Sequence, residues 1–126
     1  MDKIVEMLQG VFFIATEDGD QPRVRPFDGA ALIDDKIYIE TLREKNVAKQ
    51  LILNPKCEVF AMGDLGQVRF SAVARLAEGD EAEEAIAAIG KYHEGATDKV
   101  AIFALENILA KLTDRDGAIS EIAGVI

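Results

Sequence analysis

The sequence predicts a single domain, residues 1–126, that is mainly β with flanking helices and whose strands form a closed or nearly closed barrel. Three observations predict this class. Short runs rich in β-branched and aromatic residues alternate with turn residues along the chain. Three other segments show helical periodicity instead. The chain has 126 residues and 49% hydrophobic content, which suffices for one core, and closing a barrel removes exposed strand edges.

The first elements are read from periodicity and turn residues. Residues 2–9 carry apolar side chains at helical spacing and precede a glycine, which predicts a short helix. VFFIAT at 11–16 predicts a strand. After a turn, a second strand is predicted over 23–33, with Gly29 as a bulge or a close backbone approach, and a third over 37–41.

The middle of the chain changes period twice. Residues 42–55 return to helical spacing, and an Asn-Pro pair stops this predicted helix. Residues 56–62 and 67–77 predict two strands, joined as a hairpin by GDLG at 63–66.

The last part of the chain predicts one more helix and two or three strands. The helix runs over 80–92, with Asp80 as its cap and acids in its first turns. Strands are predicted at 100–105 and 108–113, although residues 106–112 fit a helix equally well, and the C-terminal tail fits one last strand.

Charge excludes some classes of function. The net charge is −9, which disfavours a duplex nucleic-acid partner, yet residues 21–75 hold nine Lys/Arg against seven Asp/Glu, a net of +2. A locally basic half fits a small anion held in a pocket. No apolar run reaches the roughly 18–20 residues that span a bilayer, and the N-terminus lacks a signal-peptide pattern, so we expect a cytoplasmic protein with no membrane partner.

The chain offers few residues for metal or nucleophilic chemistry. One cysteine, Cys57, and one histidine, His93, make a zinc site improbable. We interpret Cys57 as a packing residue and His93 as a solvated one. The sequence has no Gly-rich phosphate loop, no nucleophile elbow and no HExxH motif, so we assign neither catalytic residues nor metal ligands.

Basic and hydroxyl side chains follow the second and third predicted strands. Arg23 and Arg25 lie two apart and therefore share one strand face. Lys45 and Lys49 lie four apart on the next helix, and Thr41 lies at the strand–helix junction. Convergence of these groups with the helix N-terminus would hold a phosphate monoester. The alternative is an exposed strand arginine, with helix-surface lysines paired to Glu40 and Glu44.

The chain resembles the FMN-binding split β-barrels related to pyridoxamine 5′-phosphate oxidase. The resemblance rests on four segments: VFFIATEDGDQPRVRPF (11–27), IYIET (37–41), K-x-x-x-K-Q-L-x-x-N-P (45–55) and VRFSAVA (68–74). It implies a six-stranded split barrel with Greek-key topology and a homodimer with two FMN molecules in clefts at the dimer interface. A flavin-dependent oxidoreductase or reductase acting on a small redox substrate is the implied function.

The resemblance also implies a cofactor-binding set. It places Arg25 and Thr41 at the FMN phosphate. The basic residues near the phosphate would be Lys45 and Lys49. The backbone of 26–29, which includes Pro26 and Phe27, would run beside the flavin ring, and Gln67 would contact the ring across the dimer interface. Arg23 has two possible roles, a contact with the phosphate or an ion pair with an acid such as Glu40.

Two departures from the family pattern open alternatives. Asn46-Val47 stands where the oxidase carries an adjacent basic pair, and no Arg or His follows Arg115, where the oxidase grips its substrate phosphate. We therefore expect no vitamin B6 oxidation. The alternatives are a non-enzymatic ligand-binding or regulatory dimer that has lost FMN, and a relative that binds haem or a deazaflavin. A haem would need His93 or Cys57 as its axial ligand.

Overall fold

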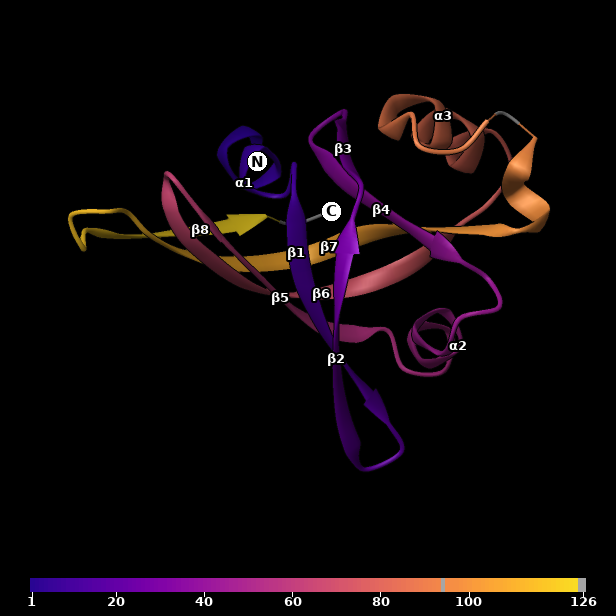
Figure 1. Ribbon diagram of the computed structural model, residues 1–126, viewed down its shortest axis with the longest axis horizontal. Coiled ribbons are helices and arrows are strands. Elements are labelled where there is room, and N and C mark those ends of the chain that lie inside the picture. The colour runs from indigo at the N-terminus through magenta and orange to yellow at the C-terminus, as the bar shows by residue number, and fades with distance from the viewer. Residues whose placement is uncertain (94, 125–126) are drawn as a thin grey trace.

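The computed structural model describes residues 1–93 and 95–124 (Figure 1). Its helices are α1 (Asp2–Met7), α2 (Asn46–Leu53), α3 (Gly79–Ile89) and the short 3₁₀ helix η1 (Ala96–Asp98). Its strands are β1 (Val11–Asp18), β2 (Gln21–Asp28), β3 (Ala30–Ile33), β4 (Lys36–Leu42), β5 (Lys56–Gly63), β6 (Gly66–Ala77), β7 (Val100–Thr113) and β8 (Ile119–Gly124). Among the described residues, no helix is long and apolar enough to cross a membrane.

All eight strands belong to one antiparallel sheet with the order β2-β1-β5-β6-β7-β4-β3, and β8 pairs with β7 beside this path. The two ends of the path, β2 and β3, are separated in the chain by Gly29 alone. The sheet must therefore curl until its ends meet, as the ribbon shows (Figure 1). Both α1 and α3 contact β3, and they lie on opposite sides of the β3–β4 hairpin.

The prediction of one continuous strand over 23–33 is wrong, because this segment forms two strands. Gly29 has a φ of 120°, a region that side-chain-bearing residues rarely adopt, and it divides the segment into β2 and β3. A Cβ at this position would lie 3.3 Å from Ile89 Cγ2 and 3.7 Å from Glu40 Cγ. The side chains of Ile89 and Glu40 therefore approach the backbone closely at Gly29, where the chain changes partner from β1 to β4.

The two strands predicted at 100–105 and 108–113 are one strand, β7, and the helical alternative is wrong. Burial alternates strictly over its second half, which is the pattern of a strand with one face in the core. The strand is irregular between its two halves. Asn107 has a positive φ of 52°, and the pairing with β6 shifts register opposite it, between Ser71 and Val73. The C-terminal tail adds β8, as expected.

The predicted helix over 42–55 begins later, at Asn46, because β4 continues to Leu42. The strand predicted over 37–41 is confirmed as the central part of β4, and its residues are buried on both faces. The helix predicted over 80–92 ends at Ile89, where Gly90 adopts the left-handed conformation. Its N-cap is Glu78, so Asp80 lies in the first turn without capping it.

Burial of β4 on both faces divides the core into two clusters. The larger fills the barrel and includes Phe12, Phe70 and Phe103, together with Ile4 of α1 and Leu8, the C-cap of that helix. The smaller lies between α3 and the outer side of the sheet and includes Tyr38, Ile86 and Ile102. Helix α3 is therefore part of the packing around β4.

A charged network fixes α3 at the edge of the smaller cluster. Arg75 on β6 donates two hydrogen bonds to Glu81, at 2.9 and 2.8 Å, and a third to Glu106 at 2.7 Å. The Tyr38 hydroxyl donates to Glu81 at 2.7 Å. Hydrogen bonds from Arg75, the main cause, lower the pKa of Glu81 to about 2, and burial together with Glu81 raises the pKa of Tyr38 to about 12.

Glu81→Gln tests this anchor. The pKa of Glu81 is depressed in the folded state, so its contribution to stability is present above pH 4.5 and is lost as the pH falls through about 2. We expect the variant to lose about 1 kcal/mol of unfolding free energy at pH 7, since the network is partly exposed, and to match the wild type near pH 2. Urea unfolding across this range measures both values. The control is Glu84→Gln on the same helix, and equal losses for both variants would contradict the assignment.

Candidate functional site

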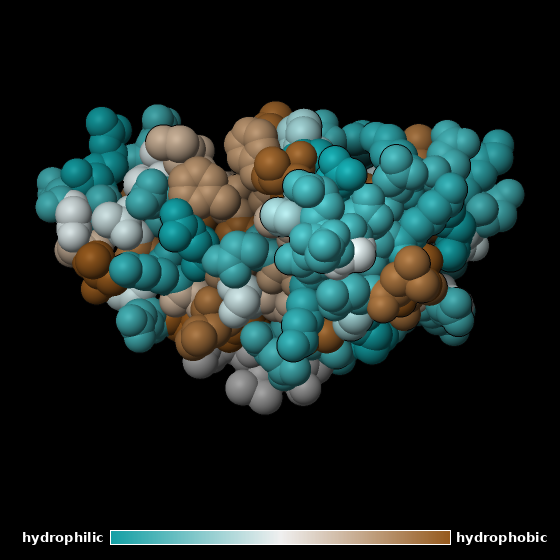
Figure 2. Space-filling view, turned by 90° about the horizontal axis from the view of Figure 1, so that it is seen from below, coloured by the Kyte–Doolittle hydropathy of each residue, from teal (hydrophilic) through white to brown (hydrophobic). Residues whose placement is uncertain are grey.

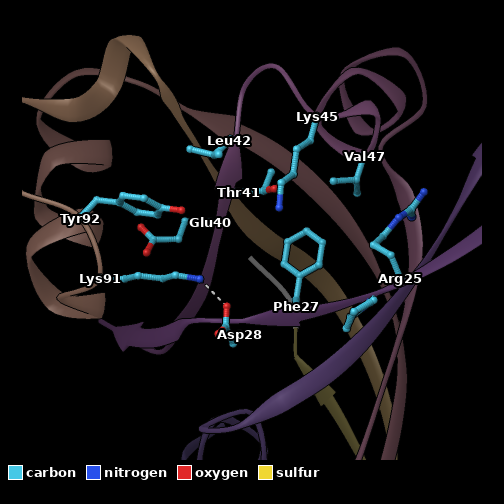
Figure 3. Close-up of a pocket in the computed structure, with 11 residues that line it drawn as sticks. Arg25, Phe27, Asp28, Glu40, Thr41, Leu42, Lys45, Val47, Lys91 and Tyr92 are labelled. Atoms are coloured by element: carbon cyan, nitrogen blue, oxygen red, sulfur yellow. Dashed lines mark hydrogen bonds and ion pairs between the residues drawn. The ribbon is translucent and has the colours of Figure 1, made fainter.

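Two adjoining hollows lie where β2 and β4 meet the start of α2. The larger, which we call the cleft, is open, has a volume of about 780 Å³ and runs between β2 and α2. The smaller, which we call the inner pocket, has a volume of about 60 Å³ and extends towards the end of α3 (Figure 3). The two hollows share four lining residues: Arg25, Pro26, Lys45 and Val47.

Arg25 is held in place by its own chain. Its Nη1 donates to Thr16 Oγ1 at 2.7 Å and to the Ile14 carbonyl at 3.3 Å, and its Nη2 donates to Gln50 Oε1 at 2.6 Å. Thr16 Oγ1 also donates to Gln50 Oε1, at 2.7 Å. The Nε–H and one N–H of Nη2 have no partner among the described residues. A fixed, half-buried guanidinium thus keeps donors for an anion.

Keeping Arg25 charged costs more free energy than keeping an exposed arginine charged. Partial burial and then the positive charge of Arg23 lower its pKa. Figure 3 shows its guanidinium directed away from the Phe27 ring and the inner pocket. An anion in the cleft would meet Arg25 there and offset this cost.

Arg23 lies on the exposed side of the cleft. Its Nε is 3.4 Å from Asp18 Oδ2, and both side chains are about half exposed, at 53% and 51%. The ion pair with Glu40 considered from the sequence is therefore not formed. An exposed pair of this kind contributes under about 1 kcal/mol, so Arg23 can leave Asp18 at little cost.

Of the other predicted residues, Thr41 and Lys45 both lie at the inner pocket, but they reach it from different elements. Thr41 is buried in β4 and lines the inner pocket, but it lies five residues before the first residue of α2 and not at the helix N-terminus. Lys45 is the N-cap of α2, and its ammonium points towards the space between Thr41 and Phe27 (Figure 3). Asn46 lines the cleft and Val47 is buried.

Lys49 is not brought to the site, and Gln50 takes that place. The core face of α2 is formed by Val47, Ala48 and Leu51, and at about 100° per residue Lys49 points away from it. Gln50 flanks the core face and reaches Arg25. The pairing of Lys45 and Lys49 with Glu40 and Glu44 is also absent, since no such ion pair forms among residues 1–93 and 95–124.

Gln67 lies outside both hollows. It is exposed on β6 and lines a separate surface hollow with Leu65 and Leu112. Within one copy of the chain it does not approach Arg25 or Phe27. Its expected contact across a dimer interface stays a prediction.

Sequence reasoning missed the acidic end of the inner pocket. Glu40 is only 3% exposed, and neither carboxylate oxygen has a hydrogen-bond partner among the described residues. Burial raises the pKa of Glu40 to about 7, against the opposing charge of Lys91. Lys91 Nζ is bonded to Asp28 instead, and Tyr92 lies beside the carboxylate (Figure 3). The available signal was a lone acid inside the otherwise apolar run IYIE.

The arrangement joins a cleft lined by three basic residues and by the acids Asp18 and Glu44 to a buried acid, Glu40. The cleft offers Arg25, Lys45 and the N-terminus of α2, whose first turn carries no acidic residue. Among the described residues, no group of His, Cys, Asp and Glu side chains could hold a metal ion. Cys57 is buried, donates to the Ala72 carbonyl and has a pKa raised to about 12 by burial, which confirms that it is a packing residue.

Comparison with known proteins supplies the family. Residues 1–111 match the family described as pyridoxamine 5′-phosphate oxidase. No match was found among curated proteins. A NimC/NimA family protein from Clostridium acetobutylicum is 29% identical with a TM-score of 0.86, and the match covers 98% of this chain and 91% of that one.

Two further structures share the fold at lower identity. A pyridoxamine 5′-phosphate oxidase-related, FMN-binding protein from Nostoc punctiforme is 13% identical with a TM-score of 0.60, over 97% of this chain and 94% of that one. HutZ, a haem storage protein from Vibrio cholerae, is 19% identical with a TM-score of 0.64, over 82% and 87%. These matches confirm the predicted split barrel, with a sheet of eight strands in place of six.

Glu40→Gln tests the buried acid. The pKa of Glu40 is raised in the folded state, so its contribution to stability is present below pH 4.5 and is lost as the pH rises through about 7. The variant cannot ionise here, so its stability relative to the wild type should rise by about 1–3 kcal/mol between pH 5 and pH 8. Urea unfolding at both pH values measures this change. Parallel pH profiles would show that Glu40 is solvated or paired. Glu44→Gln, which removes an exposed acid outside the inner pocket, is the control substitution.

Proposed function

Because the chain belongs to the pyridoxamine 5′-phosphate oxidase family, we propose that it binds FMN in the cleft through the phosphate and works as a flavin-dependent oxidoreductase. The observation that carries the proposal is the guanidinium of Arg25, which is fixed by Thr16 and Gln50 beside the N-terminus of α2 and keeps free N–H donors. Lys45 adds a second positive charge from the N-cap position.

The residues present fit a phosphate-bearing cofactor. Charge-assisted hydrogen bonds from a fixed guanidinium and backbone N–H groups of a helix start are the donors that phosphates prefer. A volume of about 780 Å³ lies within the roughly 300–1,000 Å³ typical of ligand pockets. β2 lies at one end of the strand path, so the edge of the backbone at Pro26 and Phe27 that faces away from β1 is unpaired and can hydrogen-bond to a flat ring.

The redox chemistry would come from the flavin, which transfers hydride or single electrons when bound. The contribution of the chain is to hold the cofactor and set the electrostatics around it. We assign no catalytic acid or base for this step. The expectations that the chain does not oxidise vitamin B6 and that it is cytoplasmic stay predictions.

Haem is the second candidate, because HutZ, a haem storage protein, shares the fold. Cys57 is unsuited as an axial ligand, since it lies in the barrel core with its pKa raised to about 12. His93 is exposed in the loop between α3 and η1 and would have to serve instead. A deazaflavin, or a ligand-binding dimer without FMN, remains as the alternative if neither cofactor is retained. Denaturing the purified protein and identifying the released cofactor by mass spectrometry distinguishes these outcomes.

A homodimer is part of the proposal because the outer face of the sheet carries exposed apolar side chains between charged ones such as Arg69 and Lys111. Side chains on this face include Phe13 and Phe60, paired across β1 and β5, and exposed Val24, Met62 and Leu109 at 69%, 68% and 61%. Apolar side chains also reach the surface between polar ones on the side of the molecule shown in Figure 2. A second copy that covered the outer face would remove these side chains from water, and the contact of Gln67 with a partner's cleft stays a prediction.

Arg25→Ala and Arg23→Ala test the phosphate assignment. Loss of the fixed, partly desolvated contact of Arg25 should weaken FMN binding by about 2–3 kcal/mol, roughly a hundredfold, whereas loss of exposed Arg23 should cost under about 1 kcal/mol. Quenching of flavin fluorescence measures both dissociation constants. Riboflavin, which lacks the phosphate, is the matched ligand and should be nearly indifferent to Arg25→Ala. Equal losses for FMN and riboflavin would assign Arg25 to the fold or to the ring.

Leu109→Glu tests the dimer. A buried glutamate on the outer face of both copies should convert the dimer to a monomer at micromolar concentration, because two unpaired charges would lose their hydration. Light scattering measures the mass. Leu53→Glu on α2, where Leu53 is 88% exposed and away from the sheet, is the matched control and should stay dimeric. A wild-type monomer would rule out the dimer and the shared cleft together.

A further inference from the structure

Glu40 is a buried carboxylate that the fold places at a pocket without giving it a partner. It is 3% exposed and both oxygens lack a hydrogen bond among the described residues. It pairs with Ile102 of β7 in the sheet, and the inner pocket lies on the side of its carboxylate. Figure 3 shows the carboxylate between the side chains of Lys91 and Tyr92.

Two of the neighbouring polar groups, Tyr38 and Lys91, already have hydrogen-bond partners. Tyr38, two residues earlier on the same face of β4, donates to Glu81. The ammonium of Lys91 is bonded to Asp28, at the end of β2. The pair of Lys91 and Asp28 is exposed, at 44% and 64%, so it can open at little cost. A fully buried carboxylate without a hydrogen bond is costly, and such groups in native proteins call for a functional explanation.

We propose that the inner pocket binds the protonated amine of a small ligand, with the Glu40 carboxylate as its counter-ion. An ammonium supplies both the charge and the N–H donors that the two oxygens lack. The volume of about 60 Å³ exceeds the roughly 10–15 Å³ that one water needs, so a group of a few heavy atoms fits. Lys91 and Tyr92 follow the end of α3 at Ile89 and lie across this space.

The inner pocket shares Arg25, Pro26, Lys45 and Val47 with the cleft. An amine held at Glu40 would therefore lie next to whatever occupies the cleft, which makes small amines the substrate class of the site. Only this assignment as a substrate subsite rests on the proposed function. Binding of an amine at Glu40 does not require flavin in the cleft, so the two can fail separately.

The test uses methylammonium as the probe on the full chain as purified, with glutamate labelled at ¹³Cδ and the Glu40 signal assigned by its loss in Glu40→Gln. A two-atom probe can be expected to bind at about 10 mM at best, so the titration runs to about 100 mM. We expect a saturable shift of the Glu40 signal and a fall of its titration midpoint by about 1–3 pH units. Methanol, which has the same size and no charge, and sodium chloride at equal ionic strength should give neither.

Two variants separate the proposal from a general charge effect. Glu84→Gln removes an exposed acid from α3 and should leave methylammonium binding unchanged. Lys91→Met removes the nearest competing cation and should tighten binding severalfold. Loss of binding in Lys91→Met, or a Glu40 signal that moves no further with methylammonium than with sodium chloride, would overturn the proposal. Repeating the titration with FMN added tests the neighbouring cleft: amine binding without FMN binding would keep the amine site and reject the flavin function.

Discussion

Gly29 joins the two ends of the strand path, β2 and β3, and the curl of the sheet depends on this junction. The chain leaves β1 and begins to pair with β4 within a single residue, which requires a φ of 120°. A side chain at this position would also press on Ile89 Cγ2 and approach Glu40 Cγ. The same residue therefore closes the barrel, admits the end of α3 and leaves room for a buried acid beside it.

The two hollows follow from this closure. Because β2 and β4 meet at the junction, Arg25 from one strand and Thr41 from the other line the same inner pocket. The turn after β4 then brings the start of α2 over β2, where Gln50 fixes the guanidinium. Arg25 and Lys45 lie on the α2 side, whereas Glu40 lies on the α3 side beside Lys91 and Tyr92, so the two ends of the site differ in chemistry.

Much of the fold could be predicted from the sequence, because strands with one buried face alternate visibly and hairpins carry glycines. The hairpin of β5 and β6 and the short helix α1 are of this kind. Errors arose at the ends of elements, as where Leu42 ends β4 and does not begin a helix, and where one residue changes the strand partner, as at Gly29. For the site, the sequence named Arg25 and Lys45 as candidates, and both line the two hollows. Glu40 could not be identified as a pocket residue, because its surroundings come from Lys91 and Tyr92, about 50 residues later in the chain.

Strand β7 pairs with β6 along its length, with β4 over its first half and with β8 over its second. It is therefore the only strand among residues 1–93 and 95–124 that connects the β1-β5-β6 side of the sheet to β4. During synthesis on the ribosome, residues 1–99 emerge first, and until β7 follows both β4 and β6 present unpaired edges. Open edges of apolar strands associate readily with other chains. The nascent chain is thus most exposed to misassembly just before β7 leaves the exit tunnel, and closure of the barrel is a late event imposed by the order of the strands.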